Sequence, residues 1–186
     1  MLTYEIDIAG LKRKLPICRV TDDMYIGAFV IFGDVELTVH CATELLKRAP
    51  EYDYLIAPEA KSIPLLYEMA RQSGKNKYFL ARKSPKLYMT GVFEVEVKSI
   101  TTEKVQKLVL DKADADEMRG KRILIIDDVI STGESLKAVE ELVEKAGGII
   151  AGRMFALAEG DAKKRDDVIY LAPLPLFNAD GTQKSC

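Results

Sequence analysis

The sequence is poor in the residues that build metal sites and disulfides: its 186 residues contain three cysteines, one histidine and no tryptophan. Cys18, Cys41 and Cys186 have neither metal-ligand nor CxxC spacing, which argues against a cysteine metal site and predicts reduced thiols. No apolar stretch approaches the roughly 20 residues that span a bilayer, and the N-terminus lacks the charged-then-apolar pattern of a signal peptide. We therefore expect a cytoplasmic protein without a membrane partner.

An excess of charge of one sign is also missing, because 27 lysines and arginines face 29 aspartates and glutamates, for a net charge of −2. This balance argues against a nucleic-acid partner, and an anionic ligand must be held by local basic groups. Neither GxxxxGK[ST] nor GxGxxG occurs, which disfavours other kinds of nucleotide-binding module. The length, without repeats or a clear linker, fits a single domain over residues 1–186.

The most informative segment is Arg122-Ile-Leu-Ile-Ile-Asp-Asp-Val-Ile-Ser-Thr-Gly-Glu-Ser135. Residues 123–126 predict a strand buried on both faces, and apolar residues at helical spacing over 136–146 predict a helix. In the turn between them, backbone N–H groups, hydroxyls and the positive end of the helix dipole suit an anion such as phosphate. Asp127 and Asp128 are placed to accept hydrogen bonds from sugar hydroxyls. The combination predicts a phosphorylated ribose as ligand, although many such units bind nothing.

The remaining pattern alternates strands with helices. It predicts strands at 54–57, 77–83, 149–158 and 168–171, helices at 34–49 and 62–73, a ribbon of 92–97 with 105–110, short strands or a hairpin in 3–20, and a loose tail from Asn178. We expect an α/β fold with a parallel, doubly wound central sheet flanked by helices, a small N-terminal hood over residues 1–33 and a β-ribbon lid over 88–110. Ligands of such sheets collect at the carboxyl ends of the strands, so the loops after Ala57, Ala81 and Ile126 are expected to line one site.

Segment 122–135 resembles the phosphoribosyl pyrophosphate (PRPP) signature of the type I phosphoribosyltransferases: four apolar residues, two acids, two apolar residues, a Thr-Gly turn and a hydroxyl. Three more segments, in the same order, resemble adenine phosphoribosyltransferases. They are Pro58-Glu-Ala-Lys61, similar to Glu-Ala-Arg-Gly; Ala81-Arg-Lys-Ser-Pro-Lys-Leu87, similar to Arg-Lys-x-x-Lys-Leu; and Leu171-Ala-Pro-Leu-Pro-Leu-Phe177, similar to Leu-Ala-Pro-x-Pro-Phe-Phe. The resemblance is closest over residues 53–177.

This resemblance implies an enzyme of purine salvage. With Mg²⁺ as cofactor, it would transfer 5-phosphoribosyl from PRPP to a purine, adenine first, giving a nucleoside monophosphate and pyrophosphate, and it would act as a homodimer. The implied catalytic residues are Glu103, Asp127 and Asp128, of which the two aspartates are also the metal ligands, directly or through water. The implied PRPP-phosphate residues are Val129, Ile130, Ser131, Thr132, Gly133, Glu134 and Ser135. The implied pyrophosphate residues are Ala60, Lys61, Arg82, Lys83 and Lys86, and the implied base-binding residues are Cys18 and Arg19.

Five positions leave the assignment of roles open. Lys61 replaces an arginine of the family, and its point charge lacks the bidentate fork of a guanidinium. Glu134 stands where the family often has glycine, and its charge weakens phosphate binding if the side chain turns inward. Glu103 is equally an exposed acid of the ribbon in a place where the family has a mobile loop. Cys18 and Arg19 are equally structural.

Two alternatives for the function follow from these departures. The first is a phosphoribosyltransferase for hypoxanthine, xanthine or guanine. The second is a regulator that senses PRPP without turnover. Such regulators usually carry a DNA-binding segment, whereas the residues before the first core strand are neither basic nor similar to a helix-turn-helix, so the enzyme is the favoured interpretation.

Overall fold

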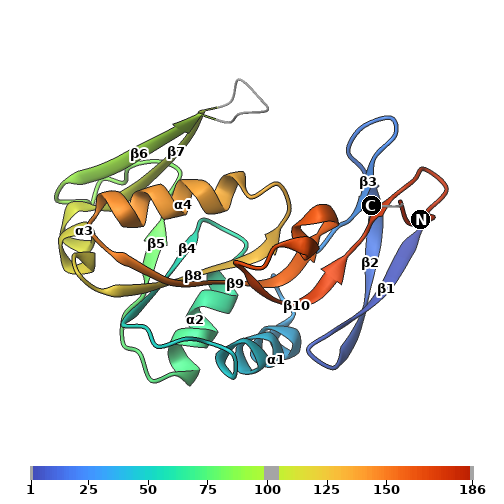
Figure 1. The fold of residues 1–186 in the computed structure, drawn as a ribbon, viewed down its shortest axis with the longest axis horizontal. Helices are drawn as coiled ribbons and strands as arrows, with labels where there is room; N and C mark the ends of the chain where they lie inside the picture. Colours follow the sequence, from blue (N-terminus) through green and yellow to red (C-terminus); the bar gives the residue numbers. More distant parts are fainter. Residues whose placement is uncertain (1, 99–104, 185–186) are drawn as a thin grey trace.

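A five-stranded sheet between two layers of helices forms the centre of the computed structural model, which describes residues 2–98 and 105–184 (Figure 1). In spatial order, the sheet consists of β10 (Ile169–Leu174), β9 (Ile149–Glu159), β8 (Arg122–Ile130), β4 (Tyr54–Pro58) and β5 (Phe79–Ala81). All neighbouring strands are parallel, which confirms the predicted α/β fold. β5 is shorter than the predicted strand, and β8 is longer, because it continues through Asp127 and Asp128.

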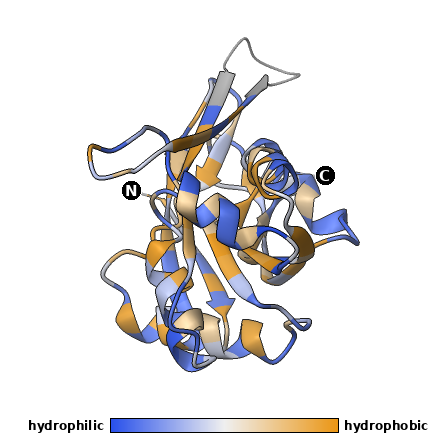
Figure 2. Cartoon of the chain, turned by 90° about the vertical axis from the view of Figure 1, so that its left-hand side faces the viewer, coloured by the Kyte–Doolittle hydropathy of each residue, from blue (hydrophilic) through white to orange (hydrophobic). Residues whose placement is uncertain are grey.

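Helices cover both faces of this sheet because its strands bury both rows of their side chains. α1 (Val35–Leu46) and α2 (Ile63–Gln72) lie on one face, and α4 (Glu134–Lys145) lies on the other (Figure 1). In β8, Leu124 and Ile126 belong to the core under α1 and α2, whereas Ile123 and Ile125 belong to the core under α4. This is the two-residue period of a strand. Hydrophobic residues accordingly concentrate in the strands between the helical layers (Figure 2).

The sequence pattern did not predict α3 (Lys112–Met118), a short helix that begins where the Asp111 carboxylate accepts a hydrogen bond from the Ala113 N–H. It did predict the start of α1, where the Asp34 carboxylate accepts from the Leu37 N–H at 3.0 Å. Pro64 lies in the first turn of α2, as expected for a residue that donates no backbone hydrogen bond.

An antiparallel sheet, which we call the hood, consists of β1 (Thr3–Ile8), β2 (Leu11–Arg19), β3 (Tyr25–Gly27) and β11 (Leu176–Phe177), in the order β1-β2-β3-β11. The Arg13 guanidinium of β2 donates to both carboxylate oxygens of Asp34 at 2.6 and 3.1 Å, which attaches the hood to the start of α1. The prediction of a loose tail is wrong. The Asn178 N–H donates to the Thr182 carbonyl at 2.8 Å, and Gln183 pairs with Phe177, because the tail folds back as a turn at the edge of the hood.

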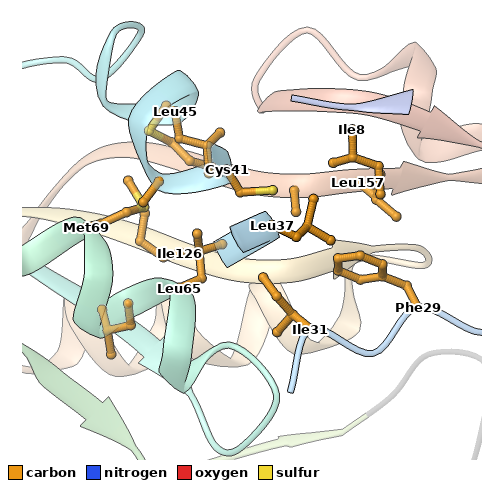
Figure 3. Close-up of a cluster of buried hydrophobic side chains, with 14 of the residues drawn as sticks. Ile8, Phe29, Ile31, Leu37, Cys41, Leu45, Leu65, Met69, Ile126 and Leu157 are labelled. Carbon is orange, nitrogen blue, oxygen red and sulfur yellow. The ribbon is translucent and has the colours of Figure 1, made fainter. Parts of the chain in front are cut away.

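The hood shares its core with the α1–α2 face of the sheet. Figure 3 shows the side chains that meet there: Ile8, Phe29, Ile31, Leu37, Cys41, Leu45, Leu65, Met69, Ile126 and Leu157. The Cys41 thiol is fully buried, and this burial raises its pKa to about 12. Cys41 is therefore a packing residue with little thiolate character.

β6 (Val92–Lys98) and β7 (Val105–Asp111) form the predicted antiparallel ribbon (Figure 1). The ribbon adjoins the edge of the central sheet, where Arg82 and Val109 exchange backbone hydrogen bonds of 2.9 and 2.7 Å. Glu103 lies outside the described residues, so its catalytic role stays a prediction. Within residues 2–98 and 105–184, no helix is long and apolar enough to cross a membrane.

Candidate functional site

A cavity of about 410 Å³ opens at the carboxyl ends of β4, β8 and β9. Its walls come from distant parts of the chain: hood residues 26–30, the loop 58–61 after β4, Lys83 after β5, Leu108 of the ribbon, the end of β8 with its following turn, and Glu159 with Leu174 at the ends of β9 and β10. Parallel strands bring their carboxyl ends to the same edge of the sheet. The three loops expected to line one site therefore do meet there.

The turn between β8 and α4 encloses a second, smaller cavity of about 100 Å³. All seven residues of the predicted phosphate turn, 129–135, line it. Gly133 is the N-cap residue of α4 and adopts a left-handed backbone with φ of 82°, a conformation that glycine reaches without strain. Gly133 has no side chain that could cap the first N–H groups of α4. The Glu134 N–H donates a long hydrogen bond of 3.4 Å to the Thr132 hydroxyl, whereas the positive end of the helix still faces the turn and suits an anion.

Asp127 and Asp128 form an acidic pair at the mouth of this turn, and both line the larger cavity. Burial raises the pKa of Asp127, and the charge of Asp128 adds to the rise. The Asp128 side chain is only 7 % exposed, and its Oδ2 atom is buried without a hydrogen-bond partner among the described residues. A buried carboxylate oxygen without a donor is costly. The Asp128 Oδ2 atom is therefore placed to accept a hydrogen bond from a ligand.

The predicted pyrophosphate residues divide into two groups. Ala60, Lys61 and Lys83 line the cavity. Arg82 and Lys86 do not: the Arg82 Nη2 atom donates to Glu59 at 3.0 Å, and the Lys86 ammonium lies 3.3 Å from the Ser84 hydroxyl. Glu59 also accepts from the Lys83 N–H at 3.1 Å, so it holds the loop after β4 against the segment after β5. Arg82 therefore positions the loop after β4 through Glu59, and Lys86 lies outside the cavity.

The two predicted base-binding residues are not brought to the cavity either. Cys18 is exposed, and Arg19 forms an ion pair with Asp22 at the outer end of β2. In the hood register, Cys18 pairs with Ile26 and Arg19 pairs with Tyr25. The part of the hood that lines the cavity is residues 26–30.

Glu159 is the cavity residue that the sequence reasoning missed. It follows Met154 to Ala158, a buried run at the end of β9, just as Asp127 follows the buried run of β8. An acid at the carboxyl end of a buried strand was therefore the signal that pointed to it. Burial raises the pKa of Glu159, whereas a hydrogen bond with Ser131 and the charge of Lys61 oppose the rise.

The carboxyl groups of the cavity limit how a metal ion could be held there. In the described ranges, no three histidine, cysteine, aspartate or glutamate side chains gather in a way that could hold a metal ion. Asp127 and Asp128 supply two carboxyl groups, and Mg²⁺ typically combines one or two carboxylates with water and substrate phosphates. The acidic pair fits a Mg²⁺ ion shared with a phosphorylated ligand, and does not fit one held by the protein alone.

Known proteins resemble this chain in sequence and in fold. A family model described as "Phosphoribosyl transferase domain" matches residues 39–172. An adenine phosphoribosyltransferase from Thermosipho africanus is 31% identical over 164 residues, which cover 87% of this chain and 92% of that protein. An orotate phosphoribosyltransferase from Caldanaerobacter subterraneus subsp. tengcongensis is 28% identical over 76% of this chain, although the chain spans only 64% of that protein. The crystal structure of adenine phosphoribosyltransferase from Thermoanaerobacter pseudethanolicus superimposes with a TM-score of 0.64 and 26% identity, covering 77% of this chain and 84% of that one.

Proposed function

The chain belongs to the phosphoribosyl transferase family, and on this premise we propose that it transfers 5-phosphoribosyl from PRPP to a purine base, adenine first, with release of pyrophosphate. One observation carries the proposal. The acidic pair, with the unpartnered Oδ2 atom of Asp128, lies between a small cavity at a helix N-terminus and a loop that carries Lys61. Asp128, an acceptor for sugar hydroxyls, thus lies between the turn 129–135, which suits one phosphate, and Lys61, a cation for a second phosphate group.

The described residues divide the work of this reaction. The N–H groups and hydroxyls of turn 129–135 hold the 5′-phosphate, and Asp128 accepts hydrogen bonds from the ribose hydroxyls. Lys61 and Lys83 neutralise charge on the pyrophosphate as its bond to the ribose carbon breaks, and a ring nitrogen of the base then bonds to that carbon. Hood residues 26–30 cover the base and restrict water, which would otherwise hydrolyse PRPP.

Three parts of the proposal extend beyond these residues. Mg²⁺, held by Asp127 or Asp128 together with PRPP oxygens, would neutralise part of the pyrophosphate charge. The ribbon of β6 and β7, which places Leu108 in the cavity wall, would close over bound PRPP. A cytoplasmic location and a homodimer remain predictions from the sequence and its resemblance.

Orotate is the second candidate acceptor, and the relative from Caldanaerobacter subterraneus subsp. tengcongensis is the observation that favours it. Adenine is preferred because its relative from Thermosipho africanus matches over a larger share of both chains. Hypoxanthine, xanthine and guanine share the purine ring of adenine and complete the set of acceptors to compare.

Release of pyrophosphate from PRPP and Mg²⁺ tests the proposal, with adenine, hypoxanthine, guanine, xanthine and orotate offered one at a time. We expect turnover with adenine above the other four. Turnover with orotate alone would replace adenine as the acceptor. Saturable binding of PRPP without turnover on any base would favour a PRPP sensor, and absence of PRPP binding would refute the proposal.

A further inference from the structure

Glu159 is an acidic group of the cavity to which the reaction above gives no task. Its backbone pairs with Leu174 of β10, and the Leu174 side chain in turn packs on Gly27 of the hood, where a Cβ atom would lie 3.2 Å away. On its other side, the pairing of Ala158 with Ile130 brings Glu159 beside Ser131, the next residue along the chain. Glu159 therefore lies between the hood and the phosphate turn.

The side chain of Glu159 has no structural task that explains its position. It is the N-cap residue of the short helix η1 (Gly160–Lys164), yet its carboxylate makes no capping hydrogen bond. Among the described residues, no lysine or arginine comes within ion-pair distance of it. Its hydrogen bond with Ser131 uses one site of a carboxylate that accepts several. Glu159 also lines the cavity, so its carboxylate has acceptor capacity left beside the space that a ligand would occupy.

The neighbours of Glu159 decide which ligand group it meets. The phosphate turn takes the 5′-phosphate and the acidic pair takes the ribose, so the hood side of the cavity is left for the base. Hood residues 26–30 contribute apolar side chains and glycine to this wall and no charged group. Lys61 is the cation whose charge acts on Glu159, and it belongs to the opposite, pyrophosphate side. A base against the apolar hood wall thus meets one acceptor of negative charge, Glu159.

We propose that Glu159 is a specificity-determining residue of this site: it accepts a hydrogen bond from an N–H donor of a neutral base, such as the amino group of adenine, and disfavours a base that carries a carboxylate, such as orotate. This inference rests on the proposed phosphoribosyl transfer and names its substrate class. A pocket that pairs with a donor rejects ligands that lack one, because the buried acceptor is then left without a partner. A carboxylate on the ligand adds like-charge repulsion in a poorly solvated pocket.

The test compares three ligands, each bound to the wild-type chain, Glu159→Gln and Glu159→Asp. Ribose 5-phosphate reports on the phosphate turn and the acidic pair, whereas adenosine and orotidine 5′-monophosphates add a neutral and an anionic base. Asp161→Asn is the matched control. It also removes one negative charge, two residues along the chain from Glu159, and the Asp161 side chain is 78 % exposed. Dissociation constants are measured by calorimetry at one salt concentration.

We expect the wild type and Asp161→Asn to prefer adenosine 5′-monophosphate over orotidine 5′-monophosphate. In Glu159→Gln this preference falls by about tenfold or more, the scale of one hydrogen bond to a charged group, while ribose 5-phosphate binds as in the wild type. Glu159→Asp, which keeps the charge, retains the discrimination against orotidine 5′-monophosphate.

Four results would overturn the inference. An unchanged preference in Glu159→Gln, or a wild type that prefers orotidine 5′-monophosphate, refutes the role in specificity and leaves phosphoribosyl transfer standing. Equal losses for all three ligands in Glu159→Gln show that Glu159 only holds Ser131 and the phosphate turn. Failure of the wild type to bind ribose 5-phosphate removes the proposed function, and this inference with it.

Discussion

Replacing Gly133 with alanine tests the phosphate turn most directly. Gly133 has a φ of 82°, so any L residue there pays about 1–2 kcal/mol for a left-handed backbone. An added Cβ atom would also lie 2.8 Å from the Arg165 Nη1 atom. The guanidinium, which donates two hydrogen bonds of 2.8 and 2.6 Å to Asp167, must then shift. This ion pair is partly exposed and contributes no more than about 1 kcal/mol.

The sum is a loss of about 2 kcal/mol in the free energy of unfolding, together with a turn displaced where the phosphate binds. Gly120→Ala is the matched control: its φ is 71°, no atom lies within 4 Å of the added Cβ, and it is remote from the turn. Gly120→Ala should lose only the stability that the left-handed backbone costs, and its affinity for ribose 5-phosphate should be unchanged.

Chemical denaturation measures stability, and calorimetry with ribose 5-phosphate measures affinity. We expect Gly133→Ala to weaken ribose 5-phosphate at least tenfold, or about 1.4 kcal/mol. Adding Arg165→Ala removes the clash and leaves the backbone strain, so the double variant separates the two costs. If Gly133→Ala binds ribose 5-phosphate as the wild type does, the phosphate does not occupy this turn.

The remaining predictions concern the carboxylates of the cavity. Asp128→Asn should fold normally and lose at least tenfold in kcat/KM, about 1.4 kcal/mol; near-wild-type turnover would remove its role at the ribose. Glu59→Gln, which weakens the contacts to Arg82 and Lys83, should raise the KM for PRPP several-fold with stability little changed, and an unchanged KM would contradict the positioning role. Folding raises the pKa of Glu159 above its ordinary 4.5, so Glu159 binds more protons in the folded state than in the unfolded state. The free energy of unfolding therefore falls as the pH rises from 4.5 through the raised pKa. The melting temperature of Glu159→Gln should therefore rise relative to that of the wild type from pH 4.5 upward. An equal dependence of the two melting temperatures on pH would contradict the raised pKa.

Local signals in the sequence were sufficient for the signature segment. The buried run of β8, the acids that follow it, the hydroxyl-rich turn and the helical spacing of α4 all lie within one stretch of chain, so propensity and periodicity describe them without knowledge of distant residues. The same holds for the N-cap at Asp34 and for the two strands of the ribbon. The alternation of strands with helices then implied the parallel sheet and the edge at which its loops meet.

Other predicted site residues lie outside the cavity, because their places depend on which distant strands become neighbours. Arg82 and Lys86 follow the family order, yet the Arg82 guanidinium turns to Glu59 and Lys86 stays outside the cavity. The sequence near Cys18 cannot show that β2 and β3 pair in a register that presents residues 26–30 to the cavity instead. Nor does it show that the C-terminal strand β11 completes the hood.

The sequence by itself thus determined the fold class and predicted the phosphate turn, since both are written in short-range patterns of apolar, acidic and hydroxyl residues. Only the tertiary structure decided what lines the cavity beside that turn. Glu159 meets Ser131 through the pairing of β9 with β8, and it meets the hood through the pairing of β9 with β10 and the packing of Leu174 on Gly27. Leu174 and Gly27 lie more than 100 positions apart, and all of these contacts are fixed by the burial of whole strands rather than by any local propensity.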